Sequence, residues 1–277
     1  MDKILLTTDF SKNSLEINAY AIKLYGEKVN YILLNGFICD YAQSKKMDGE
    51  TFTDAAEFRQ YMHDKAMASL EAEKTQLLEL YPAMEIKLKA IEGIGIRAIE
   101  TATRIYSPDL VVVGTSTLDT APSKTHSSVA TRLIGSIPTD ILVVPYKYTG
   151  GDAKNVVFAY AHPEMNNEIV APFKYLIRKA KRSVTMLHVI EAEDDVFSNE
   201  AVEDFANYLE IKQFKIENVK SRQVVDTILT YCENEKPDLL VVVARKETYV
   251  QDFWIGTKVD ELACQLLQPM LALYDAP

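Results

Sequence analysis

The sequence predicts an α/β protein built from two doubly wound, parallel-sheet domains in tandem. Two observations lead to this fold class. Short runs of Val, Leu and Ile alternate with amphipathic helical patterns, and the whole pattern occurs twice along the chain. Strands that alternate with helices form parallel sheets through helical crossovers. Unbroken apolar runs such as "LVVV" at 110–113 suit strands that helices cover on both faces.

We interpret five apolar runs of the first half as strands, because each is short, rich in Leu, Ile or Val, and bounded by polar residues. They are "ILLTT" at 4–8, "VNYILLNGF" at 29–37, "MEIKLKAI" at 84–91, "DLVVVGT" at 109–115 and "DILVVPY" at 140–146. The helices between them are expected to begin near Ser11, Thr51, Ile94 and Ser127.

The second of these helices, from about Thr51 to Tyr81, is the longest expected in the chain. Its apolar positions recur at helical spacing, which predicts a surface helix packed on a sheet. They are Phe58, Met62, Ala66, Leu70 and Leu77.

The second half repeats the first. "SPDLVVVGTS" at 107–116 matches "KPDLLVVVAR" at 236–245 with Pro-Asp-Leu in register, and the same shift lays "DILVVPYK" at 140–147 on "PMLALYDA" at 269–276. A repeat of this length indicates a duplicated structural unit.

Earlier pieces repeat with a larger offset: "KILLTTDFS" at 3–11 lies over "KNVVFAYAH" at 154–162, and "YILLNGF" over "VTMLHVI". The second copy is therefore shorter in its middle, where a brief helix is expected near 200–211. Gly150 and Gly151 break any periodic pattern between the copies. We expect two Rossmann-like domains, one spanning residues 1–149 and one spanning residues 150–277.

The composition limits the classes of partner. The chain has 277 residues, 25% of them charged, with a formal net charge of -10 and a pI near 5.0. Nucleic acids and anionic membranes reward clustered Lys and Arg, so neither is expected as the main partner. The first residues, "MDKILLTTDF", lack the apolar core of a signal peptide, and no stretch approaches transmembrane length. We expect a cytoplasmic protein.

In a doubly wound sheet, ligands bind beyond the carboxyl ends of the strands, where the strand order reverses. The candidate binding residues are therefore those at strand exits. They are Thr8, Asp9, Asn35, Gly36, Gly114 and Thr115. An Asp after a strand more commonly caps the next helix, so Asp9 could instead cap the helix that begins near Ser11.

Several pieces of the sequence resemble a known family. "TTDFS" at 7–11, "LLNGF" at 33–37, "GIGIRAIETATRIYSPDLVVVG" at 93–114 and "IPTDILVVP" at 137–145 together resemble a universal stress protein domain. The resemblance covers essentially the whole chain, twice, and implies a tandem universal stress protein.

Members of this family that bind ATP carry Gly-x2-Gly-x9-Gly-[Ser/Thr] after the fourth strand and an Asp at the end of the first. The resemblance implies that Asp9 lies beside the adenosine, while the loop after the fourth strand and the following helix start receive the ribose and phosphates. Counted from Gly114, this frame falls on Thr117, Ser127 and Ser128, followed by Val129. The spacing is kept, but two of the three glycines are replaced.

Two interpretations of this loop remain open. Asp9, Gly114 and Ser128 all persist in frame, which favours binding of ATP or a related adenine nucleotide in the first domain, and the hydroxyl of Thr117 can donate to a phosphate oxygen. Alternatively, Ser127 or Ser128 only caps a helix and the protein is a nucleotide-free docking module.

The second copy departs further from the motif. The frame there gives Val243, Lys246, Gly256 and Thr257, and Tyr160 takes the place of Asp9. No nucleotide is expected in the second domain.

Neither a catalytic nor a metal-binding constellation is apparent. The sequence has no Gly-x-Ser-x-Gly elbow, no Walker Lys and no His-Glu-x-x-His helix, and its four histidines lack ligand spacing. His188 is expected to be a satisfied core residue. We do not expect an enzyme.

The family resemblance also implies an architecture, because universal stress proteins commonly dimerise by pairing their fifth strands. Such pairing hides otherwise exposed sheet edges. In this chain Asp140–Pro145 and Pro269–Tyr274 are expected to pair internally, giving a pseudo-dimer with an approximate two-fold axis. Protein partners and a homodimer of the whole chain stay open.

Overall fold

The computed structural model describes residues 1–44, 51–115, 129–134, 136–146, 148–163, 170–192, 197–245 and 254–275. Within these ranges the side chains of residues 43, 44, 254–257 and 264 are not described.

One ten-stranded sheet runs through the described part of the chain, in the order β3-β2-β1-β4-β5-β10-β9-β6-β7-β8. The strands of the first half are β1 (Lys3–Thr7), β2 (Asn30–Phe37), β3 (Glu85–Glu92), β4 (Leu110–Gly114) and β5 (Asp140–Val144). Those of the second half are β6 (Asn155–Ala159), β7 (Ser183–Ile190), β8 (Phe214–Lys220), β9 (Leu239–Arg245) and β10 (Met270–Asp275). Strand pairs within each half are parallel, and the order reverses between β1 and β4 and between β6 and β9. The predicted fold class is confirmed.

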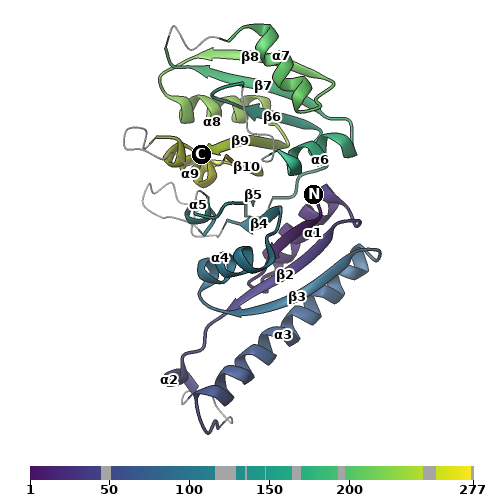
Figure 1. Cartoon of the computed structure of the whole chain (residues 1–277), viewed down its shortest axis with the longest axis vertical. Helices are drawn as coiled ribbons and strands as arrows, with labels where there is room; N and C mark the ends of the chain where they lie inside the picture. The colour runs from purple at the N-terminus through teal and green to yellow at the C-terminus, as the bar shows by residue number, and fades with distance from the viewer. Residues whose placement is uncertain are drawn as a thin grey trace.

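Helices cover both faces of the sheet (Figure 1). The first half contributes α1 (Lys12–Tyr25), α2 (Tyr41–Ser44), α3 (Ala55–Leu80), α4 (Gly95–Tyr106) and α5 (Val129–Leu133). The second half contributes α6 (Ala171–Lys179), α7 (Asn199–Tyr208), α8 (Val224–Glu235) and α9 (Trp254–Gln265). One apolar core lies under α1, α3, α6 and α7, and the other lies under α4, α5, α8 and α9. Among the described helices, none combines the length and apolar character needed to span a membrane.

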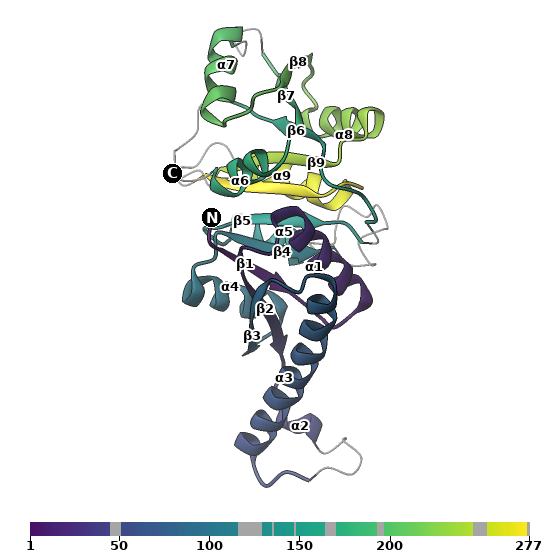
Figure 2. The same ribbon diagram turned by 90° about the vertical axis from the view of Figure 1, so that its right-hand side faces the viewer.

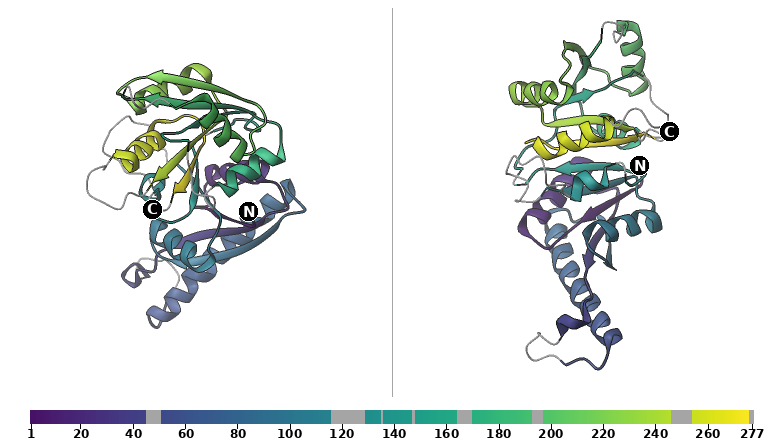
Figure 3. Two further views of the ribbon diagram at one scale, coloured as in Figure 1. Left: turned by 45° about the horizontal axis from the view of Figure 1, so that its top comes forward. Right: turned by 90° about the vertical axis from the view of Figure 1, so that its left-hand side faces the viewer.

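The two halves meet at β5 and β10, which lie side by side in the centre of the molecule (Figures 2 and 3). These strands are antiparallel, with Met270 opposite Val143, Leu271 opposite Leu142 and Ala272 opposite Ile141. The sequence repeat makes Leu142 and Leu271 equivalent, so the pairs Met270–Val143 and Ala272–Ile141 are reciprocal and the pair Leu271–Leu142 is its own reciprocal. This register gives an approximate two-fold axis between the two leucines, and the predicted internal pairing is confirmed.

The structure corrects the predicted register of the second copy. The amide of Thr8 donates to Leu34 O, and the amide of Tyr160 donates to Leu187 O in the same way. Tyr160 is therefore equivalent to Thr8, and Ala161, not Tyr160, takes the place of Asp9. The prediction was wrong by one residue, because a short apolar run fits either register and only backbone pairing selects one.

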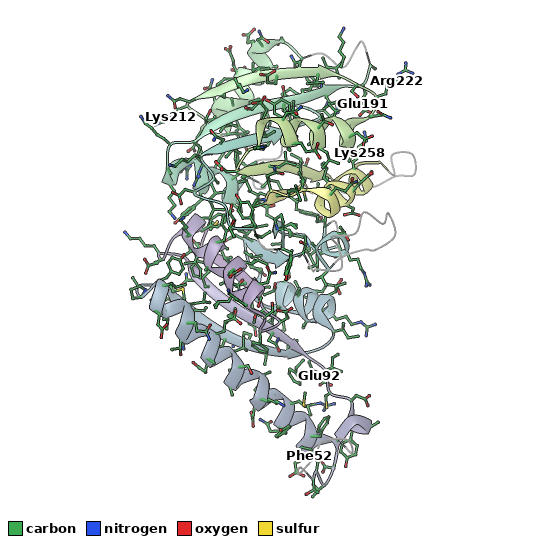
Figure 4. The ribbon with its side chains drawn as sticks, turned by 180° about the vertical axis from the view of Figure 1, so that it is seen from behind. Phe52, Glu92, Glu191, Lys212, Arg222 and Lys258 are labelled. Atoms are coloured by element: carbon green, nitrogen blue, oxygen red, sulfur yellow. The ribbon has the colours of Figure 1, made fainter. Side chains whose placement is uncertain are left out.

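The long helix α3 packs on the sheet over only part of its length. Its C-terminal part contacts β2 and β3, whereas its N-terminal end extends past the sheet, with α2 beside it (Figures 1 and 2). At that end Phe58 is buried against the rings of Phe52 and Tyr41, at centroid distances of 5.0 and 6.1 Å. Phe52 marks this tip in Figure 4. The predicted packing on a sheet thus holds for Leu70 and Leu77 but not for Phe58.

Candidate functional site

A cleft of about 500 Å³ opens at the carboxyl ends of β1 and β4, where the strand order of the first half reverses. This is the place at which doubly wound folds bind ligands. Six of the predicted site residues line it: Thr8, Asp9, Gly36, Gly114, Thr115 and Val129. The predicted residues Thr117, Ser127 and Ser128 lie outside the described part of the chain.

Side chains fold the segment between β1 and α1 into a series of short turns. The Thr8 hydroxyl oxygen accepts from the amide of Phe10 at 2.9 Å, and Asp9 Oδ1 accepts from the amide of Ser11 at 3.0 Å. Ser11 is the N-cap of α1 and accepts from the amide of Ser14 at 3.1 Å. The alternative that Asp9 caps this helix is therefore wrong, because Ser11 does so. Asp9 closes the preceding turn at the edge of the cleft.

The Asp9 carboxyl is held in its charged form. Partial burial opposes ionisation, but hydrogen bonds from Ser11 and Ser14 outweigh it and lower the pKa of Asp9. Lys12, the first residue of α1, also lines the cleft, and its exposed ammonium lies 3.5 Å from Glu16 Oε1. Among the described residues that line the cleft, the Asp9 carboxylate and the Lys12 ammonium are thus charges of opposite sign on neighbouring turns.

Packing, rather than the backbone conformation, favours glycine at position 114. Its φ is not positive, and a Cβ there would approach Ile17 Cδ1 more closely than the 3.0 Å that real Cβ atoms respect. Gly36 is similar, because a Cβ would lie 2.8 Å from that of Ala98 on α4. The two glycines let α1 and α4 close against the strand ends, and this approach shapes the walls of the cleft.

Thr115 and Asn35 serve the scaffold. The Thr115 amide donates to Val144 O, and its hydroxyl oxygen accepts from the amide of Tyr146 at 2.9 Å, which extends the contact between β4 and β5. Asn35 is 7% exposed and does not line the cleft. Its side-chain amide donates to Thr8 O at 2.9 Å and ties the ends of β1 and β2 together.

Sequence reasoning missed Glu73, a buried acid on α3. Its Oε2 accepts from the Thr8 hydroxyl at 2.5 Å, and its Oε1 accepts from Asn18 Nδ2 at 3.1 Å. Burial raises the pKa of Glu73, while these two hydrogen bonds act in the opposite direction. The signal was present in the sequence, since Glu73 falls on the apolar stripe between Leu70 and Leu77.

The orientation of the Asn18 amide follows from this acid. Asn18 Nδ2 also donates to Thr7 O at 3.2 Å, and Asn18 Oδ1 has no partner among the described residues. A flipped amide would turn an acceptor toward both the Glu73 carboxylate and the carbonyl of Thr7. The structure therefore favours an acceptor at position 73.

The second half fills the equivalent strand exits with larger side chains. His188 takes the place of Asn35, and its Nδ1 lies 3.0 Å from Tyr160 O. Val189 stands where the first half has Gly36, and Val243 where it has Gly114. His188 is 2% exposed, which confirms the predicted core histidine. The second half thus keeps a contact from a β7 side chain to the carbonyl at the end of β6, but it has larger residues at the positions of Gly36 and Gly114.

The sheet order and the cleft at its switch point define a Rossmann-like α/β protein with two tandem domains. Residues 1–145 match the model of the universal stress protein family, and the chain belongs to this family. No match was found among curated protein sequences.

Solved structures show the same fold over the full chain. A universal stress protein from Archaeoglobus fulgidus DSM 4304 is 15% identical, with a TM-score of 0.69 over 99% of this chain and 96% of that one. A protein of unknown function from Pseudomonas aeruginosa PAO1 is 14% identical, with a TM-score of 0.59 over 99% and 93%. The cytoplasmic domain of a prokaryotic cation chloride cotransporter is 9% identical, with a TM-score of 0.56 over 99% and 95%. At these identities the likeness concerns the fold alone.

Proposed function

We propose that the first domain binds ATP or a related adenine nucleotide in this cleft, and that the protein is a non-catalytic, nucleotide-responsive stress protein. The observation that carries the proposal is the open cleft with the Asp9 carboxylate at its edge. Its volume of about 500 Å³ falls within the range of small-molecule sites.

The lining of the cleft suits the parts of a nucleotide. Its apolar wall offers a surface for a purine ring and is formed by Ile17, Leu34, Ile99 and Val113. The ionised carboxylate of Asp9 can accept hydrogen bonds from ribose hydroxyls or from an adenine amino group. The same charge repels phosphate, which favours the nucleoside end of the ligand beside Asp9.

Positive potential is available for the phosphates elsewhere in the cleft. Gly95 begins α4 and lines the cleft, and a Cβ there would meet no atom within 4 Å. Ile94, the N-cap of α4, makes no side-chain capping bond, and its carbonyl accepts from the amides of Arg97 and Ala98, so the amides of Gly95 and Ile96 receive no bond from the cap. Exposed amides at a helix N-terminus and the ammonium of Lys12 both attract anions.

The test is nucleotide affinity measured by calorimetry on the purified full chain, together with mass identification of anything released by heat. We expect millimolar or tighter binding of ATP, weakened at least about tenfold (1.4 kcal/mol) by Asp9→Ala. The matched control is Asp204→Ala, which removes an exposed carboxylate from α7 in the second half. Absence of binding by ATP, ADP and AMP at millimolar concentration would refute the proposal.

A second candidate, a nucleotide-free docking module, is favoured by the packing of the motif residues. Gly114 makes room for Ile17, and the amide and hydroxyl of Thr115 both have partners within the chain. This candidate predicts a protein whose stability does not change with added nucleotide. A cytoplasmic location and the boundary between residues 149 and 150 remain predictions under either function.

A further inference from the structure

We propose that Glu73 is a positioning residue for Asp9, acting through the hydroxyl of Thr8. The inference deepens the proposed function and rests on it where ligand binding is concerned. Glu73 lies on α3, is 6% exposed and does not line the cleft, so any effect on a ligand passes through its neighbours. The neighbour that reaches the cleft is Thr8, 2.5 Å away.

The Thr8 hydroxyl has a single proton, and Glu73 determines where it goes. The Thr8 hydroxyl donates to Glu73 Oε2 at 2.5 Å, so its proton points toward α3. The Thr8 oxygen then keeps its lone pairs for the amide of Phe10 at 2.9 Å. The Ser14 hydroxyl lies 2.9 Å from the same oxygen and also reaches Ser11 O at 2.8 Å. The acid on α3 therefore fixes the direction of the Thr8 hydroxyl within this turn.

This turn contains a strained residue. Phe10 has φ 64, in the left-handed region that bulky residues rarely adopt. Such a conformation persists only where the surroundings determine it, and the bond from the Phe10 amide to Thr8 is one of those constraints. Asp9 lies between these two residues, so the direction of its carboxylate depends on the same turn. A Gln at position 73 keeps only one acceptor for the two donors that Glu73 serves, Thr8 Oγ1 and Asn18 Nδ2, so the direction of the Thr8 hydroxyl is no longer fixed and the constraint weakens.

The second half of the chain provides an internal comparison. Tyr160 takes the place of Thr8, and its ring contacts Phe205 on α7 at a centroid distance of 6.0 Å. Phe205 thus faces the strand exit from the helix that corresponds to α3, where the first half has Glu73. Ala161 takes the place of Asp9. Among the described residues of the second half, Ala161 stands at the strand exit and the apolar Phe205 faces it, so neither the carboxylate nor the buried acid is found at these two places, which supports a coupling between them.

The first test needs no ligand. Amide hydrogen exchange, followed by NMR, is compared between the unchanged chain, Glu73→Gln and the control Glu79→Gln, an exposed acid on the same helix. We expect exchange at the Phe10 amide to rise about tenfold in Glu73→Gln only, with the amide of Leu70 on α3 unchanged. An unchanged Phe10 amide, or an equal rise at Phe10 and Leu70, would overturn the proposal, because the second result reports only a weaker helix.

Variants of Thr8 keep the test decisive if Glu73→Gln folds poorly. Thr8→Val removes the hydroxyl and keeps the shape, whereas Thr8→Ser keeps the hydroxyl. We expect Thr8→Val to reproduce the faster exchange at Phe10 and Thr8→Ser to restore slow exchange. Equal exchange in the two variants would count against any role of the hydroxyl.

The ligand arm is a double-mutant cycle on ATP affinity. Glu73→Gln is expected to weaken binding about tenfold when Asp9 is present and less than about twofold in an Asp9→Ala background, because coupled residues do not add. Equal effects in both backgrounds would show that Glu73 does not act through Asp9. If the unchanged chain binds no ATP, the proposed function fails, and the exchange experiment alone decides the role of Glu73.

Discussion

The replacement Gly114→Ala tests whether the cleft is shaped by helix packing. The added Cβ would fall closer than 3.0 Å to Ile17 Cδ1, 3.7 Å from Ile17 Cγ1 and 3.8 Å from Asn13 Nδ2. Overpacking of this kind costs about 1–3 kcal/mol. The nearest atom is a terminal methyl that can rotate, but Ile17 is only 5% exposed, so we expect a loss of about 1–2 kcal/mol.

The partner variant is Ile17→Val, which removes the Cδ1 methyl itself. Alone it should cost about 0.5–1.5 kcal/mol, because it deletes a buried methyl group. Combined with Gly114→Ala, the vacated space receives the new Cβ, so the loss of the double variant should be smaller than the sum of the single losses. The assay is urea unfolding of all four chains. A neutral Gly114→Ala, or strict additivity, would refute the packing explanation for this glycine.

Three further perturbations address charged groups. Hydrogen bonds lower the folded-state pKa of Asp9, so its contribution to stability is present above about pH 4 and is lost as the pH falls through the folded pKa. The free energy of unfolding, measured against pH, should therefore fall less at acid pH in Asp9→Asn than in the unchanged chain. Lys179→Met removes two hydrogen bonds to carbonyls at the end of α1 and should cost about 1 kcal/mol in urea, whereas the exposed neighbour Lys181→Met should cost little. Burial raises the pKa of Asp140 well above its usual range, so the fold loses stability as the pH rises. Asp140→Asn removes this ionisable group and keeps an acceptor for the amide of Tyr274. We expect it to raise the melting temperature more at pH 7 than at pH 4.

The parts of the fold that could be predicted are those that local pattern determines. Apolar runs and helical stripes lie where the strands and helices form, with ends shifted by a few residues. The Asp of each Pro-Asp-Leu has the same structural role in both halves: Asp109 accepts from the amide of Lys3, and Asp238 accepts from the amide of Asn155. The repeat could therefore be read directly as structure. The family resemblance predicted the pairing of β5 and β10, which hides two sheet edges that would otherwise be exposed.

What the sequence could not provide depends on contacts between distant residues. Gly114 leaves room for Ile17 of α1, which lies on another element, and no local pattern in the sequence shows that these two residues meet. The register of the second copy depends on which backbone amide pairs with Leu187. The apolar stripe of α3 marks Glu73 as a buried acid, but its partner Thr8 lies on another element and no local pattern shows that contact. Each of these features belongs to the candidate site, where backbone geometry and buried polar groups matter more than hydrophobic pattern.

The reciprocal pairing of β5 and β10 leads to a prediction about the isolated halves. All five residues of β5 are buried in the full chain, so a fragment of residues 1–149 would expose an apolar, unpaired edge. Because the register is symmetric about Leu142 and Leu271, a second copy of the same fragment can present Leu142 where β10 presents Leu271. We therefore expect this fragment to form a homodimer through β5.

Light scattering after gel filtration distinguishes the outcomes for this fragment, with the full chain as the reference. A dimer whose β5 amides are protected from exchange would show that, in the full chain, β10 of the second half takes the place of β5 from a second copy of the first half. Residues 150–277 should behave alike through β10, because the same symmetry applies to them. A soluble monomer of residues 1–149 would contradict this prediction. It would mean that the first half is stable with β5 exposed and that pairing of β5 with β10 contributes little to its stability.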